Sequence, residues 1–153
     1  MCMELNNKTK QFWTDEDIAA LDFVETLTDM HAVAHRVLHR MPDPVVQVCG
    51  PISTGGRGSV EANLSAFTEI ISELQEKGHH VFDQVPFEIP MKKLKVTLAP
   101  GEYLETILTD FYQPLFESKK IVAFYFMADW ESSHGAKWEH EQALRLGIEI
   151  IYL

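Results

Sequence analysis

The chain has 153 residues, of which 46% are hydrophobic and 24% charged, and its formal net charge is −10. A chain of this length can bury a substantial core and usually forms one domain, because the buried fraction of the surface rises with size. The negative charge argues against binding to a nucleic acid polymer or to an anionic membrane, since both attract clustered Lys and Arg. No apolar run approaches the ~20 residues that span a bilayer.

The cysteines and the N-terminal residues point to a cytoplasmic setting. Cys2 and Cys49 are isolated and lack the spacing of a metal site, which fits a reducing compartment. Residues 1–5 lack the charged and apolar regions of a signal peptide. Cys49 falls within an apolar run, so we expect a buried strand thiol rather than a nucleophile.

The first third of the chain has a helical pattern. Residues 1–13 are polar and are expected to be loose. Thr14 and Asp17 match a capping box, and apolar residues then recur at helical spacing as far as Met41. We therefore expect one long helix, or two helices broken near residues 28–31. A linker, Pro42-Asp43-Pro44, follows.

Four strand-like runs follow that linker. The third, residues 121–127, is apolar throughout, as a central parallel strand covered on both faces should be. The others are residues 45–49, a run from His79 or His80 to Val85, and residues 148–153. Because helical patterns separate the runs, the sequence predicts an α/β fold with a doubly wound parallel sheet of four to five strands and helices on both faces. Residues 1–43 would be a helical extension of an α/β domain at 44–153.

Local signals predict where the later helices begin and end. Ser59 can cap a helix that ends at Gly78, and Gly147 is expected to end the last helix. Pro114 should kink the preceding helix or begin a new turn. Residues 86–100 fit a lid, an extra edge strand or a plain excursion equally well.

Histidines recur at two places, but we expect no metal and no cofactor. His31, His35 and His39 repeat every four residues along one helical face, and nothing nearby completes a coordination sphere. The group His134, His140 and Glu141 matches no zinc or iron spacing. The first set is expected to consist of ordinary helix-surface residues.

The fold class indicates where a ligand should bind. In open parallel sheets, ligands lie beyond the carboxyl ends of the strands, near the point where the strand order reverses. This rule selects three loops, at residues 50–58, 83–88 and 128–135. The first contains glycines, hydroxyl groups and Arg57, which suit a phosphate or a sugar, although a flexible strand-to-helix turn would explain the same composition.

Glu139 follows the third of these loops and is expected in the first turn of the last helix. The positive field of a helix N-terminus would favour the ionised carboxylate that a nucleophile needs. Ser132 and Ser133 lie just upstream and could cap the helix or hold a ligand oxygen. On these residues alone, Glu139 is explained as a good helix residue without chemistry.

Three segments together resemble the nucleoside 2-deoxyribosyltransferase-like superfamily, and most of all its small bacterial and phage branch. They are Gly50-Pro51-Ile52, His79-His80-Val81-Phe82 and Trp130-Glu131-x-Ser133-x-Gly135-Ala136-x-x-x-Glu139. The similarity extends from residue 45 to residue 153. It implies a flavodoxin-like fold, a small-molecule nucleoside or nucleotide as the partner, and a homo-oligomer in which a neighbouring subunit often completes the site.

The resemblance also implies chemistry. The superfamily glutamate that matches Glu139 attacks the anomeric carbon, and water or a second base resolves the glycosyl-enzyme. Ser133 stands where transferases of unphosphorylated nucleosides carry an aspartate and nucleoside 5′-monophosphate hydrolases carry a serine, which favours a nucleotide and hydrolysis. The leaving base needs an acid, for which Asp110 is the first candidate and Asp83 the second. The residues implied in substrate binding are Gly50, Pro51, Ile52, Ser53, Arg57, Trp130, Ser133 and Gly135.

Two other functions remain open from the sequence. If neither aspartate reaches the site, the protein would be a noncatalytic module that binds a nucleotide or nucleotide-sugar. The third possibility is an assembly protein whose N-terminal helix mediates oligomers.

Overall fold

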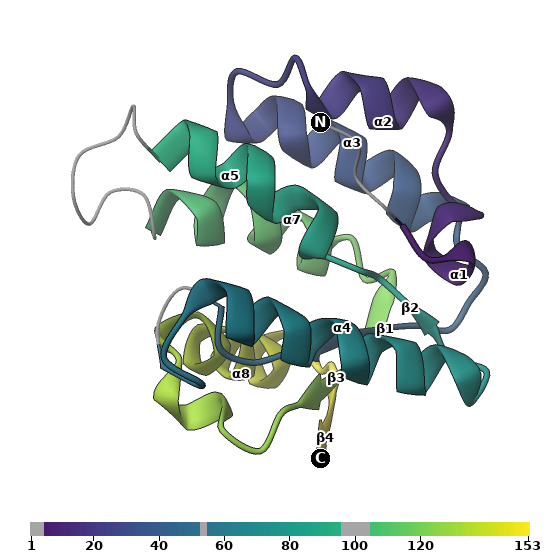
Figure 1. The fold of residues 1–153 in the computed structure, drawn as a ribbon. Coiled ribbons are helices and arrows are strands. Elements are labelled where there is room, and N and C mark those ends of the chain that lie inside the picture. Colours follow the sequence, from purple (N-terminus) through teal and green to yellow (C-terminus); the bar gives the residue numbers. More distant parts are fainter. Residues whose placement is uncertain (1–4, 53–54, 96–104) are drawn as a thin grey trace.

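The computed structural model describes residues 5–52, 55–95 and 105–153. In these ranges the chain forms a four-stranded, all-parallel sheet with the order β2-β1-β3-β4 and helices on both faces (Figure 1). The strands are β1 (Val45–Cys49), β2 (His80–Val81), β3 (Ile121–Phe126) and β4 (Glu149–Tyr152). The fold is flavodoxin-like, as the sequence predicts.

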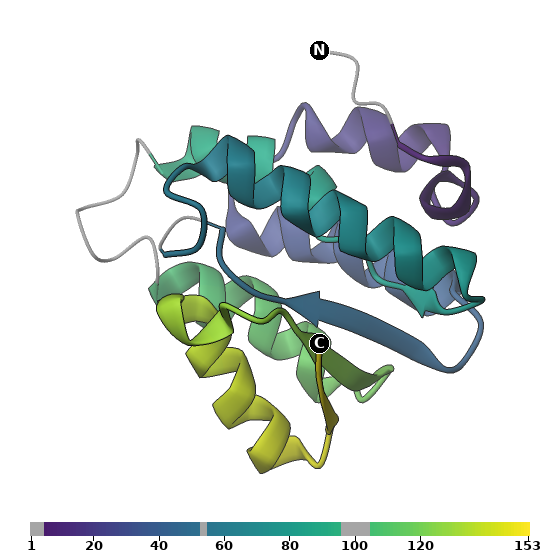
Figure 2. The same ribbon diagram turned by 60° about the horizontal axis from the view of Figure 1, so that its bottom comes forward.

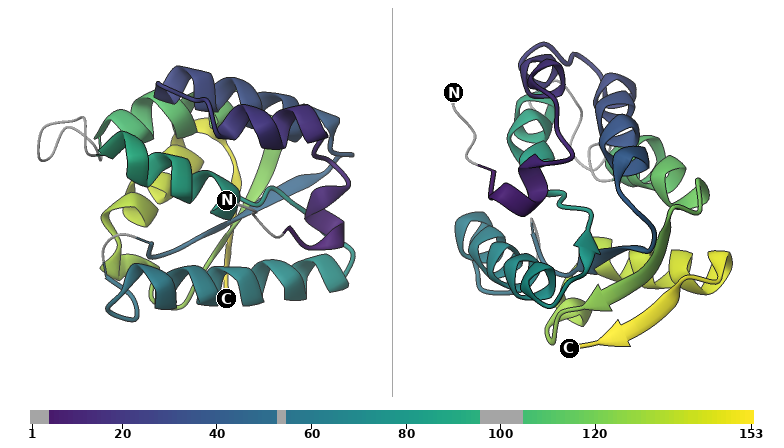
Figure 3. Two further views of the ribbon diagram at one scale, coloured as in Figure 1. Left: turned by 45° about the horizontal axis from the view of Figure 1, so that its top comes forward. Right: turned by 90° about the vertical axis from the view of Figure 1, so that its right-hand side faces the viewer.

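The two faces of the sheet are covered by different helices. Helix α4 (Val60–Glu76) packs on one face, and the larger core lies on the other (Figures 2 and 3). Helical elements that contribute to that larger core include α3 (Leu27–Arg40), the π-helix η2 (Ile107–Tyr112), α7 (Gln113–Glu117) and α8 (His134–Leu146). This division follows from right-handed crossovers, because the chain steps from β1 to β2 in one direction and from β3 to β4 in the other.

The predicted helix signals are confirmed. The Ser59 hydroxyl accepts a hydrogen bond from the Ala62 amide at the start of α4, and Gly78 follows the end of that helix with φ +96°. Gly147 ends α8 in the left-handed conformation, with φ +72°. Pro114 lies in the first turn of α7, where its missing N–H costs no hydrogen bond.

Strand β2 is shorter than predicted. The expected run to Val85 pairs with the sheet only at His80 and Val81. The Asp83 carboxylate accepts a hydrogen bond from the Val85 amide at 3.0 Å, which turns the chain into a short 3₁₀ helix, η1 (Val85–Phe87). Pro86 lacks an N–H for a sheet bond, so the strand could not continue there.

The segment after η1 is helical where the structure describes it. Helix α5 spans Glu88–Lys95, so the expected alternative of an edge strand is wrong for these residues. Residues 96–104 lie outside the described ranges, and they include residues 96–100, the rest of the segment expected to be a lid or an excursion. Among the helices described, none is both long and apolar enough to cross a membrane.

The prediction that residues 1–13 are loose is wrong for residues 5–13. A short helix, α1 (Asn7–Lys10), forms there, and Trp13 is buried in the larger core. The buried Thr9 hydroxyl donates to the Asp83 carboxylate at 3.2 Å and accepts from the Gln75 amide at 3.0 Å. These distant partners hold the N-terminal segment against β2 and α4.

Between Thr14 and β1 the chain forms two helices rather than one, as one of the two alternatives predicted. The capping box of Thr14 and Asp17 starts α2 (Asp15–Leu21), and Thr26 with Asp29 forms a second capping box at the start of α3. The second box places the break at residues 22–26, ahead of the expected position, because Thr26 takes the extended N-cap conformation.

We expect Asp17→Asn to lower the free energy of unfolding by about 2 kcal/mol at pH 7. Asp17 is buried, and burial would raise its pKa, but bonds from Arg40, Thr14 and Arg36 lower the pKa to about 2 from 3.8. The carboxylate therefore contributes stability above pH 3.8, and this contribution is lost as the pH falls towards 2. Urea unfolding at pH 7 and pH 3 would measure the difference, with the exposed Asp15→Asn as control. If Asp15→Asn lowers the free energy of unfolding as much as Asp17→Asn does, the stabilising role assigned to the Asp17 carboxylate is wrong.

Candidate functional site

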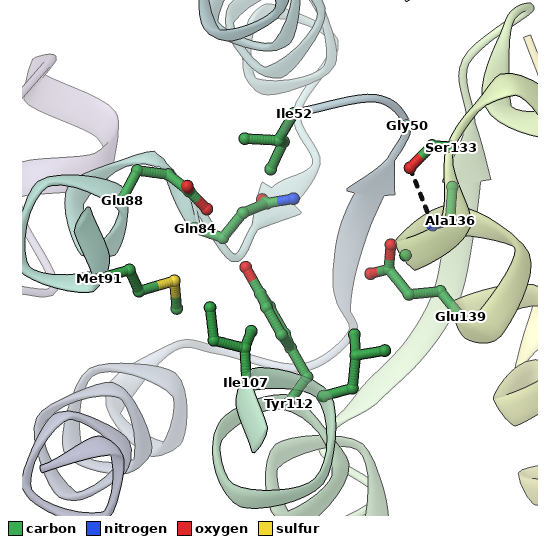
Figure 4. A pocket seen from close by; sticks show the side chains of 12 residues that line it. Gly50, Ile52, Gln84, Glu88, Met91, Ile107, Tyr112, Ser133, Ala136 and Glu139 are labelled. Atoms are coloured by element: carbon green, nitrogen blue, oxygen red, sulfur yellow. Dashed lines mark hydrogen bonds between the residues drawn. The ribbon is translucent and has the colours of Figure 1, made fainter. Parts of the chain in front are cut away.

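A pocket lies at the carboxyl ends of the strands, beside the β1/β3 boundary where the strand order reverses. Its volume is about 70 Å³. All three loops selected from the sequence reach it, together with η2. The lining residues are Gly50, Ile52, Gln84, Glu88, Met91, Ile107, Leu108, Tyr112, Ser133, Gly135, Ala136 and Glu139 (Figure 4).

Glu139 points into the pocket from α8, but in a different electrostatic setting from the one expected. Helix α8 begins at His134, so Glu139 is in the second turn, and the field of a helix end falls off within the first. Burial raises the pKa of Glu139 to about 8, although hydrogen bonds from Cys49 and Gln47 act in the opposite direction. The expectation that the helix field keeps this carboxyl ionised is therefore wrong, because desolvation outweighs it.

Two side chains of the central strand hold the Glu139 carboxyl. The Gln47 amide donates to Oε2 at 3.1 Å, and the Cys49 thiol donates to the same oxygen at 3.4 Å. Residues 47 and 49 share the face of β1 that looks toward α8, because side chains alternate along a strand. Both bonds end on the same oxygen, Oε2, and the carboxyl group lies at the pocket (Figure 4).

Cys49 is a buried strand thiol, as predicted. It is fully buried, and burial together with the neighbouring Glu139 raises the pKa of the thiol well above its usual value. A thiol with a raised pKa is a poor nucleophile, since the thiolate is the reactive form. Its contribution to the site is the hydrogen bond to Glu139.

A second buried carboxyl faces Glu139 across the pocket. Glu88, the first residue of α5, points toward Glu139 from the opposite side (Figure 4). Burial raises the pKa of Glu88 to about 7, against a smaller opposing effect of the Lys92 ammonium. Two carboxyls with raised pKa values in one pocket are typical of acid–base catalysis. The sequence rule had selected the loop that ends at Glu88, but the residue itself was not chosen as a candidate.

The two aspartates expected to supply the acid do not line the pocket. Asp110 is exposed on η2 and accepts a hydrogen bond from the Thr109 hydroxyl at 3.2 Å. The side of η2 that lines the pocket carries Ile107, Leu108 and Tyr112. Asp83 is half-buried, and desolvation raises its pKa, but its carboxylate is engaged by Thr9 and the Val85 amide.

The residues expected to bind substrate divide into two groups. Gly50, Ile52, Ser133 and Gly135 line the pocket, whereas Pro51, Arg57 and Trp130 do not, and Ser53 lies outside the described residues. Arg57 is exposed in the glycine loop. Trp130 stacks on His140 with a ring separation of 4.6 Å. The Ser133 hydroxyl oxygen accepts from the Ala136 amide at 3.2 Å and so caps α8, which leaves its hydrogen available for a ligand.

The glycine loop and the β3–α8 loop are joined directly. The Gly56 amide donates to the Ser132 hydroxyl at 2.8 Å. Gly55 has φ +69°, and a Cβ on it would lie 2.1 Å from the Ser132 carbonyl oxygen. Only glycine satisfies both this conformation and this close approach.

These features define a flavodoxin-like α/β protein with a pair of buried carboxyls at its switch point. Within the part of the chain that is described, no group of three or more potential ligands could hold a metal ion. The profile of one protein family, described as "Domain of unknown function (DUF4406)", matches residues 44–152, and the chain belongs to this family. No curated protein and no solved structure matches the sequence significantly.

Proposed function

We propose that the protein cleaves the N-glycosidic bond of a nucleoside or a nucleoside 5′-monophosphate, with Glu139 as the nucleophile. The observation that carries the proposal is the pair of buried carboxyls, Glu139 and Glu88, which face one another across the pocket. Retaining glycosidases use two carboxyls in this way, one as nucleophile and the other as acid and base. The resemblance of the segment from Trp130 to Glu139 to the deoxyribosyltransferase-like superfamily supports the choice of substrate.

The reaction takes two steps. The Glu139 carboxylate bonds to the anomeric carbon as the bond from that carbon to the base breaks, and Glu88 transfers its proton to a nitrogen of the departing base. A water molecule then attacks the same carbon, gives a proton to Glu88 and releases the Glu139 carboxylate. The reaction starts with the proton on Glu88 and with Glu139 ionised. The pKa values of about 7 for Glu88 and about 8 for Glu139 let the pair share one proton near neutral pH, and the higher value places it on Glu139 when no substrate is bound. A base nitrogen that accepts a hydrogen bond from Glu88 would draw the proton to Glu88. The bonds from Gln47 and Cys49 favour the ionised form of Glu139.

Ser133 is proposed to hold the 5′-oxygen or the 5′-phosphate of the substrate. Its hydroxyl lies at the N-terminus of α8, where the helix field favours an anion, and its hydrogen can be donated to a ligand. We also propose that the protein acts on small molecules in the cytoplasm as a homo-oligomer, as the superfamily resemblance implies. Chromatography coupled to light scattering would test the assembly.

We expect the purified protein to release free base from at least one member of a panel of ribo- and deoxyribonucleosides and their 5′-monophosphates. Glu88→Gln should lower this rate by about 10²- to 10⁴-fold, because the base would then leave without a proton. The same variant should remain active on a 7-methylpurine nucleoside, whose cationic base needs no proton to depart. Chromatography of the released base would measure both rates.

The exposed Glu61→Gln on α4 is the matched control for this experiment and should behave like the wild type. If the wild type releases base from no member of the panel, the proposed function is wrong. If Glu88→Gln is as active as the wild type, or equally impaired on both kinds of substrate, then Glu88 is not the acid.

A further inference from the structure

Gln84 presents an unpaired acceptor at the pocket. Its side chain lines the pocket and is 2% exposed. The amide nitrogen donates to the Val48 carbonyl at 2.8 Å, which fixes the orientation of the amide group. The oxygen Oε1 is buried and has no hydrogen-bond partner. A buried acceptor without a partner is costly, so this position favours a ligand that brings a donor.

Glu88 lies four residues after Gln84 and lines the same side of the pocket (Figure 4). A protonated Glu88 carboxyl donates a hydrogen bond, whereas Gln84 Oε1 only accepts one. Together they form an edge with an acceptor beside a donor. The apolar side chains of Ile52, Met91 and Ile107 line the pocket nearby, which suits a flat ring.

We infer that this edge selects a base that carries an amino group next to an unprotonated ring nitrogen, as adenine and cytosine do. In adenine, the 6-amino group would donate to Gln84 Oε1, and N7 would accept the proton of Glu88. In cytosine, the 4-amino group and N3 would make the same pair of bonds. The inference rests on the proposed function for the identity of the ligand as a nucleobase.

The size of the pocket and the chemistry of the leaving group agree with this assignment. A cavity needs at least about 10–15 Å³ to hold one water, so a pocket of about 70 Å³ has room for more than one water and can admit the edge of a flat ring. Hypoxanthine and uracil carry an oxygen in place of the amino group. That oxygen would meet Gln84 Oε1, and two acceptors would then oppose each other without a proton between them.

The same contact would recognise the base and activate it. As the bond from the anomeric carbon to the base breaks, the bonding electrons move onto the base. The proton of Glu88 passes to N7 of adenine or N3 of cytosine, and the base leaves neutral. The base-binding residue Glu88 would thus be the acid of the proposed reaction.

Calorimetric titration of the protein with free bases tests the inference without any turnover. We expect the wild type to bind adenine about tenfold to hundredfold more tightly than hypoxanthine, or cytosine more tightly than uracil by a similar factor. In Gln84→Met, which keeps the length of the side chain but removes the acceptor, this ratio should fall below about threefold. The exposed and remote Gln11→Met is the matched control.

A second comparison needs only the wild type, in case Gln84→Met does not fold. Replacing adenine by 7-deazaadenine, or cytosine by 3-deazacytosine, removes the ring nitrogen and should weaken binding about tenfold or more. Equal binding of amino and oxo bases, no binding of any of them, or an undiminished preference in Gln84→Met would overturn the inference. Base selectivity without cleavage of any nucleoside would support the inference and refute the proposed function. Cleavage of a nucleoside without base selectivity would support the proposed function and refute the inference.

Discussion

Glu139→Gln should abolish base release and, at the same time, stabilise the protein at alkaline pH. The variant keeps the shape of the side chain but has no carboxylate to attack the sugar, so we expect a loss of about 10³-fold or more in rate. Gln47 still has an oxygen to bond. Chromatographic assay of base release would measure the loss, and the exposed Glu141→Gln on the same helix should remain fully active.

The stability effect has a definite sign. Folding raises the pKa of Glu139 from 4.5 to about 8, so the native state loses stability as the pH rises through this window. The glutamine variant has no charge to bury, and its advantage over the wild type should grow between pH 5 and pH 8. It should reach about 3–5 kcal/mol at pH 9, the free energy that corresponds to such a shift. Urea unfolding at pH 5 and pH 9 would measure it. If the variant is less stable than the wild type at both values, Glu139 is a structural residue, and a loss of activity would then reflect misfolding.

Removal of residues 1–43 should prevent cooperative folding. Residues 13–41, which include helices α2 and α3, contribute buried side chains to the same core as Phe111 and Leu115. These side chains are Trp13, Leu21, Leu27, Met30, Val33, Ala34, Val37, Leu38 and Met41. The eight large apolar side chains among them contribute about 1.5–3 kcal/mol each, or about 12–24 kcal/mol together, which is as large as or larger than the 5–15 kcal/mol that typically separates native from unfolded protein. Circular dichroism during urea unfolding would show no sigmoidal transition in the truncated chain.

Deletion of residues 1–5 alone is the control for that experiment and should leave the transition in place. A truncated chain that unfolds cooperatively, and changes only in oligomer size, would instead support the assembly role considered for the N-terminal helices. The DUF4406 match begins at residue 44. If the truncated chain does not fold, the folding unit is longer than the segment that matches the family.

The parts of the fold that depend on local chemistry were predictable from the sequence. The run that became β3 is apolar throughout, the run that became β1 is apolar except for Gln47, and the caps at Thr14, Ser59 and Gly147 depend only on neighbouring residues. The order of residues 5–13 was not predictable, because Thr9 is held by Asp83, 74 positions away, and by Gln75. The length of β2 depended on a turn that competes with sheet pairing at the Asp83 carboxylate.

For the site, topology identified the right loops but not the right second acid. Asp110 was the first candidate because of its position before the third strand. The π-helix that contains it turns other side chains to the pocket, and the wider turn of such a helix shifts the phase that an α-helical pattern predicts. Glu88 lay at the end of a selected loop, yet nothing in the sequence showed that α5 would carry it to a position opposite Glu139.

The contact between the glycine loop and Ser132 bears on how this pocket could be redesigned. A side chain at Gly55 would collide with Ser132, and the Gly56 amide is bonded to the Ser132 hydroxyl. A glycine loop transplanted from a relative would be shaped to fit the β3–α8 loop of that relative. Exchange of binding specificity within the family should therefore succeed only when both loops are grafted as a matched pair.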